Sequence, residues 1–217
     1  MLVSAEIRWF WRDASPLGLR DWFESAEVHG CPVGGGDEEP RPDAYLRDAS
    51  QQELGIKARA GKSIEVKGLV AVIWNGLPSG PFAGPIEIWT KWSAPALTLN
   101  AATTIGTRKT RWLRKFNTAG AIPAEIPLNK KEQPADDKIE PPDLGSNVEL
   151  TEVKTSSEVW WTFAFETFGK LTTIQNDLQA VTSVLAARNP PGLGTPLLAS
   201  YPAWLQSRLR AGVFAAG

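Results

Sequence analysis

The sequence has little of the residues that build covalent or metal-centred sites. Its 217 residues include a single cysteine, Cys31, and a single histidine, His29. One cysteine excludes a disulfide within the chain, which is typical of proteins in a reducing compartment. A zinc site built from several histidines, or from cysteine and histidine together, is excluded as well. Any metal site must therefore use carboxylates, whose oxygens suit Mg²⁺ or Mn²⁺.

Long apolar runs and a large excess of one charge are also missing. No stretch approaches the roughly 20 apolar residues that span a membrane. Charged residues begin at Glu6, so we expect no signal peptide, no membrane insertion and a cytoplasmic location. The formal net charge is -1, so no global field favours nucleic acid or anionic lipid, and a cationic site must be local. The ten tryptophans are interpreted as core and barrel-wall residues.

Alternating polar and apolar residues predict β-strands along most of the chain. The segment 53–69 predicts a hairpin with its turn at Gly61-Lys62. Four charged residues alternate with apolar ones in its two strands. A connecting loop with an odd number of residues would place all four on one face of the sheet. These residues are Lys57, Arg59, Glu65 and Lys67.

Further segments of the chain alternate in the same way. The opening strand, 3–11, carries Ser4, Glu6 and Arg8 on one face. The strand predicted at 85–93 carries Glu87, Trp89 and Lys91 on one face. A short strand is expected at 43–48, and the segments 147–154 and 158–168 predict a second hairpin.

The strand predicted at 107–117 carries five cationic residues. Their spacing divides them between the two faces of the strand, and a bulge would decide which set faces inward. Arg108 and Arg114 share one face, whereas Lys109, Arg111 and Lys115 share the other.

Helices are predicted at 16–26, at 171–188 and at 203–210. The segment Asn129–Asp143 is charged and proline-rich, so we expect an exposed, mobile insertion. Together these elements predict a single domain, 1–217, of the α+β class. It is mainly an antiparallel sheet that closes into a barrel with a polar lumen, with a long C-terminal helix and short flanking helices.

These motifs, in this order, resemble the CYTH superfamily of triphosphate tunnel enzymes. Members begin with a strand of the form Glu-x-Glu-x-Lys, which here is Ser4–Arg8, so serine replaces the first glutamate and arginine the lysine. Strands of the form Leu-Arg-Ile-Arg and Leu-Thr-Leu-Lys match Ile56–Arg59 and Ile64–Lys67. The family's later features are matched by the arginine-bearing strand 108–115, by Glu166 before Gly169, and by the ending 200–205. Thr162 and Ala164 stand where the late strand of the family has further carboxylates.

The resemblance implies an eight-stranded antiparallel tunnel that binds a triphosphate chain and Mg²⁺ or Mn²⁺. It implies metal-dependent hydrolysis of an inorganic or organic triphosphate, and a phosphorylated small molecule as the partner. The implied catalytic residues are Glu6, Glu65 and Lys67. The implied metal ligands are Glu6 and Glu166, with Glu65 or Glu87 as substitutes. The implied phosphate-binding residues are Arg8, Lys57, Arg59, Lys67, Lys91, Arg108 and Arg114.

Two alternatives remain open at this point. One is a non-catalytic barrel whose tryptophan-lined lumen binds an organic or anionic small molecule. The other is a barrel whose lumen charges only pair with one another. The sequence does not indicate the oligomeric state.

Two weaker motifs are set aside. Gly61-Lys62-Ser63 matches the end of a phosphate-binding P-loop, but Ile56 stands where the first glycine belongs and no helix pattern follows. The strand 108–115 interleaves Trp112 with cations, but one such strand in a chain of net charge -1 does not favour nucleic acid.

Overall fold

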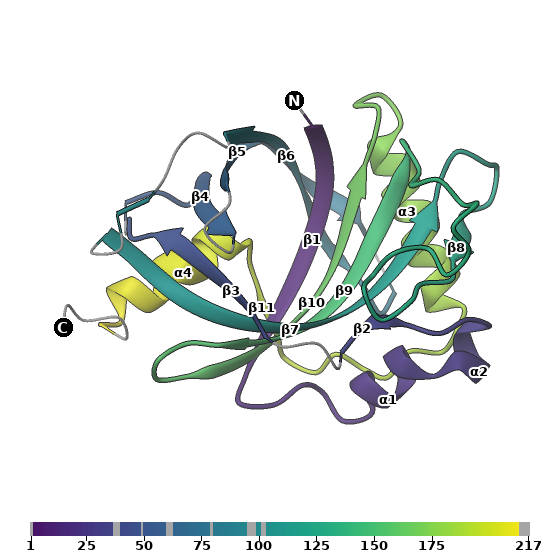
Figure 1. The fold of residues 1–217 in the computed structure, drawn as a ribbon, viewed down its shortest axis with the longest axis horizontal. Coiled ribbons are helices and arrows are strands. Elements are labelled where there is room, and N and C mark those ends of the chain that lie inside the picture. The colour runs from purple at the N-terminus through teal and green to yellow at the C-terminus, as the bar shows by residue number, and fades with distance from the viewer. Residues whose placement is uncertain are drawn as a thin grey trace.

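The computed structural model describes residues 2–36, 40–48, 50–59, 63–78, 80–94, 99–100 and 103–212. Within them, eight antiparallel strands close into a barrel (Figure 1). In chain order they are β1 (Leu2–Arg12), β3 (Arg41–Leu46), β4 (Leu54–Arg59), β5 (Ser63–Leu77), β6 (Gly84–Ala94), β7 (Thr104–Asn117), β9 (Gly145–Lys154) and β10 (Val159–Phe168). Around the barrel the order is β10-β9-β7-β3-β4-β5-β6-β1, and β1 pairs with β10 to close it.

Three short strands extend the sheet. β2 (Gly34–Gly35) and β8 (Ala124–Ile126) pair with β7 beyond the part that β3 covers, and β11 (Leu197–Leu198) pairs with β1. The predicted antiparallel barrel is therefore confirmed, with additional strands along its wall.

The predicted hairpin at 53–69 is confirmed by strands β4 and β5. Lys57 lies opposite Glu65, and Gly55 lies opposite Lys67, which places these charged residues on the same face. The predicted turn at Gly61-Lys62 lies outside the described residues. The strands predicted at 3–11, 85–93 and 107–117 and the second hairpin are confirmed by β1, β6, β7, β9 and β10.

The helices are α1 (Leu19–Glu24), α2 (Ala26–His29), α3 (Ile174–Ala186) and α4 (Tyr201–Arg210). The long C-terminal helix predicted at 171–188 is wrong in its extent, because α3 has 13 residues. Leu171, which extends the apolar period by one turn, is 62% exposed and lies in a turn. α4 begins two residues before the predicted start, where Ser200 accepts a hydrogen bond from the backbone N–H of Ala203. No helix in the described residues is long and apolar enough to cross a membrane.

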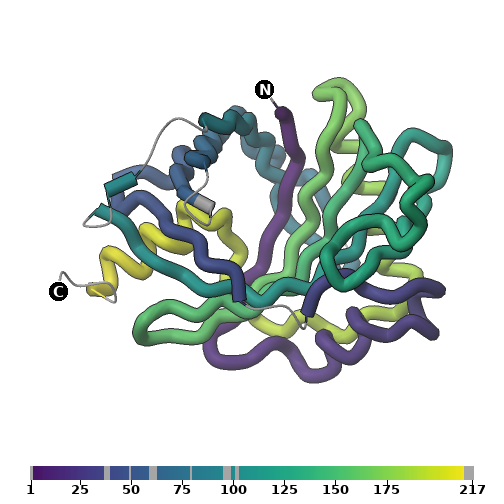
Figure 2. The backbone as a smooth tube through the Cα atoms, in the orientation of Figure 1, coloured from purple at the N-terminus to yellow at the C-terminus, as the bar shows by residue number. Residues whose placement is uncertain are grey.

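The main apolar core lies outside the barrel, between its wall and helices α1 and α3 (Figure 1). Ala5, Ile7 and Trp9 of β1 point into this core. Because side chains alternate along a strand, Ser4, Glu6 and Arg8 must point the other way, into the barrel. The tube view in Figure 2 shows the wall strands curving around this interior.

Helix α4 fills one end of the barrel. Trp204 stacks on Phe10 of β1 with ring centroids 5.1 Å apart, and it meets Trp160 of β10 edge-on. Phe10 and Trp160 have the same parity as the inward-facing residues of their strands, so this cluster lies within the barrel. The remaining interior is polar and forms the pocket described below.

The segment 129–143 is mostly exposed, as predicted. The side chain of Asn129 accepts hydrogen bonds from the backbone N–H groups of Lys131 and Gln133, which orders its first turn. The mobility of the segment stays a prediction.

Candidate functional site

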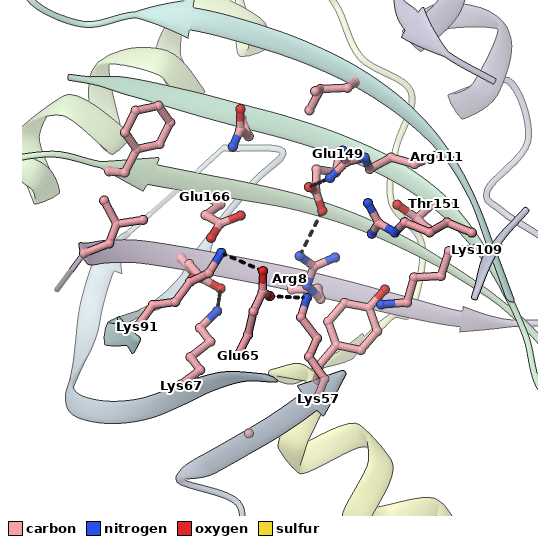
Figure 3. A pocket seen from close by; sticks show the side chains of 18 of the residues that line it. Arg8, Lys57, Glu65, Lys67, Lys91, Lys109, Arg111, Glu149, Thr151 and Glu166 are labelled. Carbon is pink, nitrogen blue, oxygen red and sulfur yellow. Dashed lines mark hydrogen bonds and ion pairs between the residues drawn. The ribbon is translucent and has the colours of Figure 1, made fainter. Parts of the chain in front are cut away.

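The interior of the barrel contains a pocket of about 580 Å³ (Figure 3). Every barrel strand contributes to its lining, and α4 contributes Tyr201 and Pro202. Eight cationic side chains and five carboxylates line it, so cations are in excess. The cations are Arg8, Arg41, Lys57, Lys67, Lys91, Lys109, Arg111 and Lys115. The carboxylates are Glu6, Glu65, Glu132, Glu149 and Glu166.

Most of the residues proposed from the sequence meet in this pocket. It brings together Glu6, Arg8, Lys57, Glu65, Lys67, Lys91 and Glu166 from β1, β4, β5, β6 and β10. For Arg59 only the backbone is described; it lies in β4 opposite Ser63, and its side chain lies outside the described part of the chain.

Arg108 and Arg114 do not reach the pocket, because they lie on the outer face of β7. Arg108 is exposed, and Arg114 is buried against other elements. The guanidinium of Arg114 donates to the carbonyl of Phe23 at 2.9 and 2.6 Å and forms an ion pair with Glu125 at 2.6 Å. Arg114 therefore ties the barrel wall to α1 and β8, and its proposed contact with phosphate is not supported.

The inward-facing cations of β7 are those at the other parity, namely Lys109, Arg111 and Lys115. The sequence left this choice open. Sequence reasoning also missed Arg41, Glu132, Glu149 and Tyr201. Of these, Glu149 had a usable signal, because it alternates with the apolar Val148 and Leu150 in a predicted strand.

Three glutamates form a cross-strand row. Glu6 on β1 lies directly opposite Glu166 on β10 and, on its other side, directly opposite Glu87 on β6. Glu6 accepts a hydrogen bond from Ser4 Oγ at 2.6 Å and forms an ion pair with Lys67 Nζ. Glu87 accepts one from Trp89 Nε1 at 2.9 Å but does not line the pocket.

The pKa values of the two facing glutamates, Glu6 and Glu166, are shifted in opposite directions. Burial and the neighbouring charge of Glu6 raise the pKa of Glu166. Burial also favours the neutral form of Glu6, but Lys67 together with Ser4 and Arg8 outweighs it and lowers the pKa of Glu6. The two facing carboxyls thus differ in their tendency to hold a proton, as acid and base pairs in active sites do.

These carboxylates fit a divalent ion only in part. Among the described residues, no group of three or more histidine, cysteine, aspartate or glutamate side chains is placed to hold a metal. Mg²⁺ commonly uses one or two carboxylates together with waters and substrate phosphates. Glu6 and Glu166 therefore suit an ion that enters with a phosphate ligand better than one held by the protein alone.

Lys109 lies deep in the pocket within a polar and aromatic cluster. Its Nζ donates to Tyr45 Oη, lies 3.2 Å from Asp43 Oδ2 and sits 3.9 Å from the centroid of the Tyr201 ring. Burial lowers the pKa of Lys109 well below its ordinary value, although Asp43 opposes the shift. This amine therefore loses its proton more readily than an ordinary lysine.

Two arginines present guanidinium groups to the pocket and share one carboxylate. Arg8 donates to Thr162 Oγ1 at 2.8 Å and to Glu149 at 3.3 Å. Arg111 donates to Glu149 at 2.7 Å and also pairs with Glu132. Burial favours the neutral form of Glu149, but Arg111 and Arg8 outweigh it and lower its pKa. Glu149 thus stays charged and orients both guanidinium groups.

No tryptophan lines the pocket in the described part of the chain. Trp160 and Trp204 pack inside the barrel, but at the end that α4 fills. Binding of an organic ligand against tryptophan stays a prediction. Six tryptophans pack in the apolar clusters, namely Trp9, Trp22, Trp112, Trp160, Trp161 and Trp204. The predicted role of most tryptophans as core and wall residues is confirmed for these six.

Comparison with known proteins does not identify the chain. No protein-family model and no curated protein matches it.

Proposed function

We propose that this protein binds a triphosphate, inorganic or esterified to an organic group, inside the barrel and hydrolyses it with Mg²⁺ or Mn²⁺. The observation that supports this most strongly is the excess of cations that line a pocket of about 580 Å³, eight against five lining carboxylates. Asp43 lies behind the lining and pairs with Arg41 and Lys109, so the excess falls to eight cations against six carboxylates when it is counted. An excess of buried positive charge is costly. A triphosphate carries several negative charges and would offset it.

The geometry also suits phosphate oxygens. Guanidinium groups bind phosphate through two parallel hydrogen bonds, whereas ammonium groups act as point charges. Arg8 and Arg111 supply the first kind of contact, and Lys67, Lys91 and Lys115 supply the second. The polar pocket ends at α4, so a phosphate chain would lie between this floor and the opposite part of the pocket, which Leu2 and Phe168 line.

In this proposal Glu6 and Glu166 hold the divalent ion together with the phosphates. The ion would neutralise phosphate charge and help to position the reacting group. Lys109 is an inward-facing amine whose pKa is lowered well below its ordinary value by burial. It is therefore our candidate for accepting the proton of the attacking water, whereas Glu166 acts as a metal ligand.

The test is phosphate release from tripolyphosphate, ATP and thiamine triphosphate, with Mg²⁺ or Mn²⁺. We expect turnover in the wild type and its loss in Glu6→Ala. Glu152→Ala is the matched control, because Glu152 is a strand glutamate of β9 that does not line the pocket. Turnover that is equal in Glu6→Ala and the wild type would overturn the proposed metal site.

A second candidate function is binding without hydrolysis. It is favoured by the ion pair between Lys67 and Glu6, which already neutralises one of the two carboxylates in place of a metal. In that case none of the three compounds is hydrolysed, but tripolyphosphate raises the melting temperature of the wild type. Lys67→Glu should abolish this rise, and a rise that persists in the variant would contradict the assignment of the site.

A further inference from the structure

Glu132 differs from the other carboxylates of the pocket in its origin. The other four lie on barrel strands, whereas Glu132 lies on the exposed segment 129–143. Its side chain lines the pocket and pairs with Arg111. The two side chains are each about one-fifth exposed, at 20% for Arg111 and 23% for Glu132.

The contact uses the part of Arg111 that a phosphate would use. Arg111 Nε donates to one carboxylate oxygen of Glu132 at 2.8 Å, and Nη2 donates to the other. The third nitrogen, Nη1, donates to Glu149. Two parallel hydrogen bonds from Nε and Nη2 are the arrangement in which a guanidinium binds two phosphate oxygens. With Glu132 in place, this edge of Arg111 cannot bind a ligand.

The backbone that presents Glu132 is conformationally unfavourable. Glu132 has a φ of 61°, in the left-handed region that residues other than glycine rarely adopt. The turn around it maintains this conformation. The N–H of Glu132 donates to the carbonyl of Asn129 at 2.9 Å, and Asn129 Oδ1 accepts hydrogen bonds from the N–H groups of Lys131 and Gln133. The left-handed backbone at Glu132 therefore has a free-energy cost that its contacts, including the pair with Arg111, must offset.

Glu132 also lines two basic pockets that share part of their wall. A second pocket of about 350 Å³ lies beside the first, and both are lined by Arg41, Lys109, Arg111 and Glu132. Withdrawal of Glu132 would open the guanidinium edge of Arg111 towards both pockets.

We propose that Glu132 is an internal competitor for the anion: its carboxylate occupies the phosphate-binding edge of Arg111 and is displaced when an oligophosphate binds. This inference rests on the proposed function, because it requires the pocket to bind phosphate. It assigns to Glu132 the role of setting the affinity of the site and of releasing the turn 129–134 when a ligand enters.

The experiment is calorimetric titration of tripolyphosphate, without metal, into the wild type, Glu132→Gln and Glu140→Gln. Glutamine keeps the shape and hydrogen-bonding capacity of the side chain but loses its charge. We therefore expect phosphate to displace it from Arg111 more easily and the Kd to fall by about tenfold. Glu140→Gln is the matched control, because Glu140 is an exposed residue of the same segment that does not line the pocket. It removes the same charge and should leave the Kd within about twofold of the wild type.

The outcomes separate this inference from the proposed function. Binding to the wild type with an unchanged or higher Kd in Glu132→Gln would overturn the inference and leave the proposed function standing. Equal tightening in Glu132→Gln and Glu140→Gln would also overturn it, because a general change in charge would then explain the effect. Binding to Glu132→Gln alone would support it. No binding to any of the three, either without metal or in a repeat with Mg²⁺, would overturn both proposals.

A second variant guards against a purely structural role for Glu132. Glu132→Ala removes the hydrogen bonds as well as the charge, and it should also bind tripolyphosphate more tightly than the wild type. If Glu132 only anchors the turn, Glu132→Ala should instead bind equally or more weakly, and this result would contradict the proposal.

Discussion

Arg108 and Lys115 lie on the same strand, β7, but on opposite faces of the barrel wall. Lys115 lines the pocket, whereas Arg108 is exposed on the outside. Burial and the nearby Arg111 lower the pKa of Lys115. Among the residues that the structure describes, none forms an ion pair with it. Lys115 is therefore a cation that the protein itself does not neutralise closely.

We predict that Lys115→Gln weakens tripolyphosphate binding about tenfold, since a hydrogen bond to a charged group contributes roughly 1.5–3 kcal/mol. The melting temperature should hardly change, because no ion pair is broken. Arg108→Gln removes the same charge from the outer face and should change the Kd by less than about twofold. Titration calorimetry on the two variants tests this, and an equal effect of both would contradict the inward orientation of Lys115.

His29, in contrast to Lys115, is a titratable group that does not line the pocket and whose contacts hold the fold together. Its Nε2 lies 3.0 Å from the carbonyl of Trp22, and its Nδ1 lies 2.6 Å from Arg188 Nη1. The carbonyl can only accept and the guanidinium can only donate, so both contacts fit a neutral ring with its proton on Nε2. Burial and the charge of Arg114 lower the pKa of His29 to about 4.

This shift predicts a loss of stability in mild acid. The unfolded chain has a histidine pKa of about 6.5, so between pH 6.5 and 4 it binds a proton that the folded protein does not. The free energy of unfolding should therefore fall as the pH drops through this window, by at most about 1.4 kcal/mol per pH unit from this residue. Urea unfolding at pH 7, 6 and 5 should show a shallower loss in His29→Gln, and parallel profiles would contradict the shift.

At the scale of elements, α4 determines where the polar interior stops. Trp204 is fully buried between Phe10 and Trp160 at the end of the barrel. In the described part of the chain its Nε1 has no hydrogen-bond partner. Its contribution therefore comes from packing alone, and the indole N–H opposes it.

We predict different costs for two substitutions at this position. Trp204→Ala should lower the free energy of unfolding by roughly 3–5 kcal/mol, because it leaves a large cavity. Trp204→Phe keeps the stacking on Phe10 and removes the unpaired donor, so it should cost less than about 1.5 kcal/mol. Urea denaturation compares them, and a cost of Trp204→Phe equal to that of Trp204→Ala would contradict the importance of stacking at this position.

At the scale of the whole molecule, period-two alternation was sufficient to predict most strands and the inward faces of β1, β4, β5 and β6. It could not decide the parity of β7, because both faces of that strand carry cations. The two sets differ only in tertiary context, since Arg114 is neutralised outside the barrel by Glu125 from β8. Alternation also could not place Glu132, because a residue on an irregular segment has no periodic signal.

The proposal that the cations of the barrel interior bind a triphosphate is tested most directly by a crystal structure with tripolyphosphate and Mg²⁺. Our account predicts a linear anion inside the barrel, contacting Arg8, Lys67 and Lys115, with Arg111 released from Glu132. It also predicts an ion between Glu6, Glu166 and the phosphates. A barrel without the anion in crystals of a protein that binds tripolyphosphate in solution, or an anion bound outside the barrel, would contradict it.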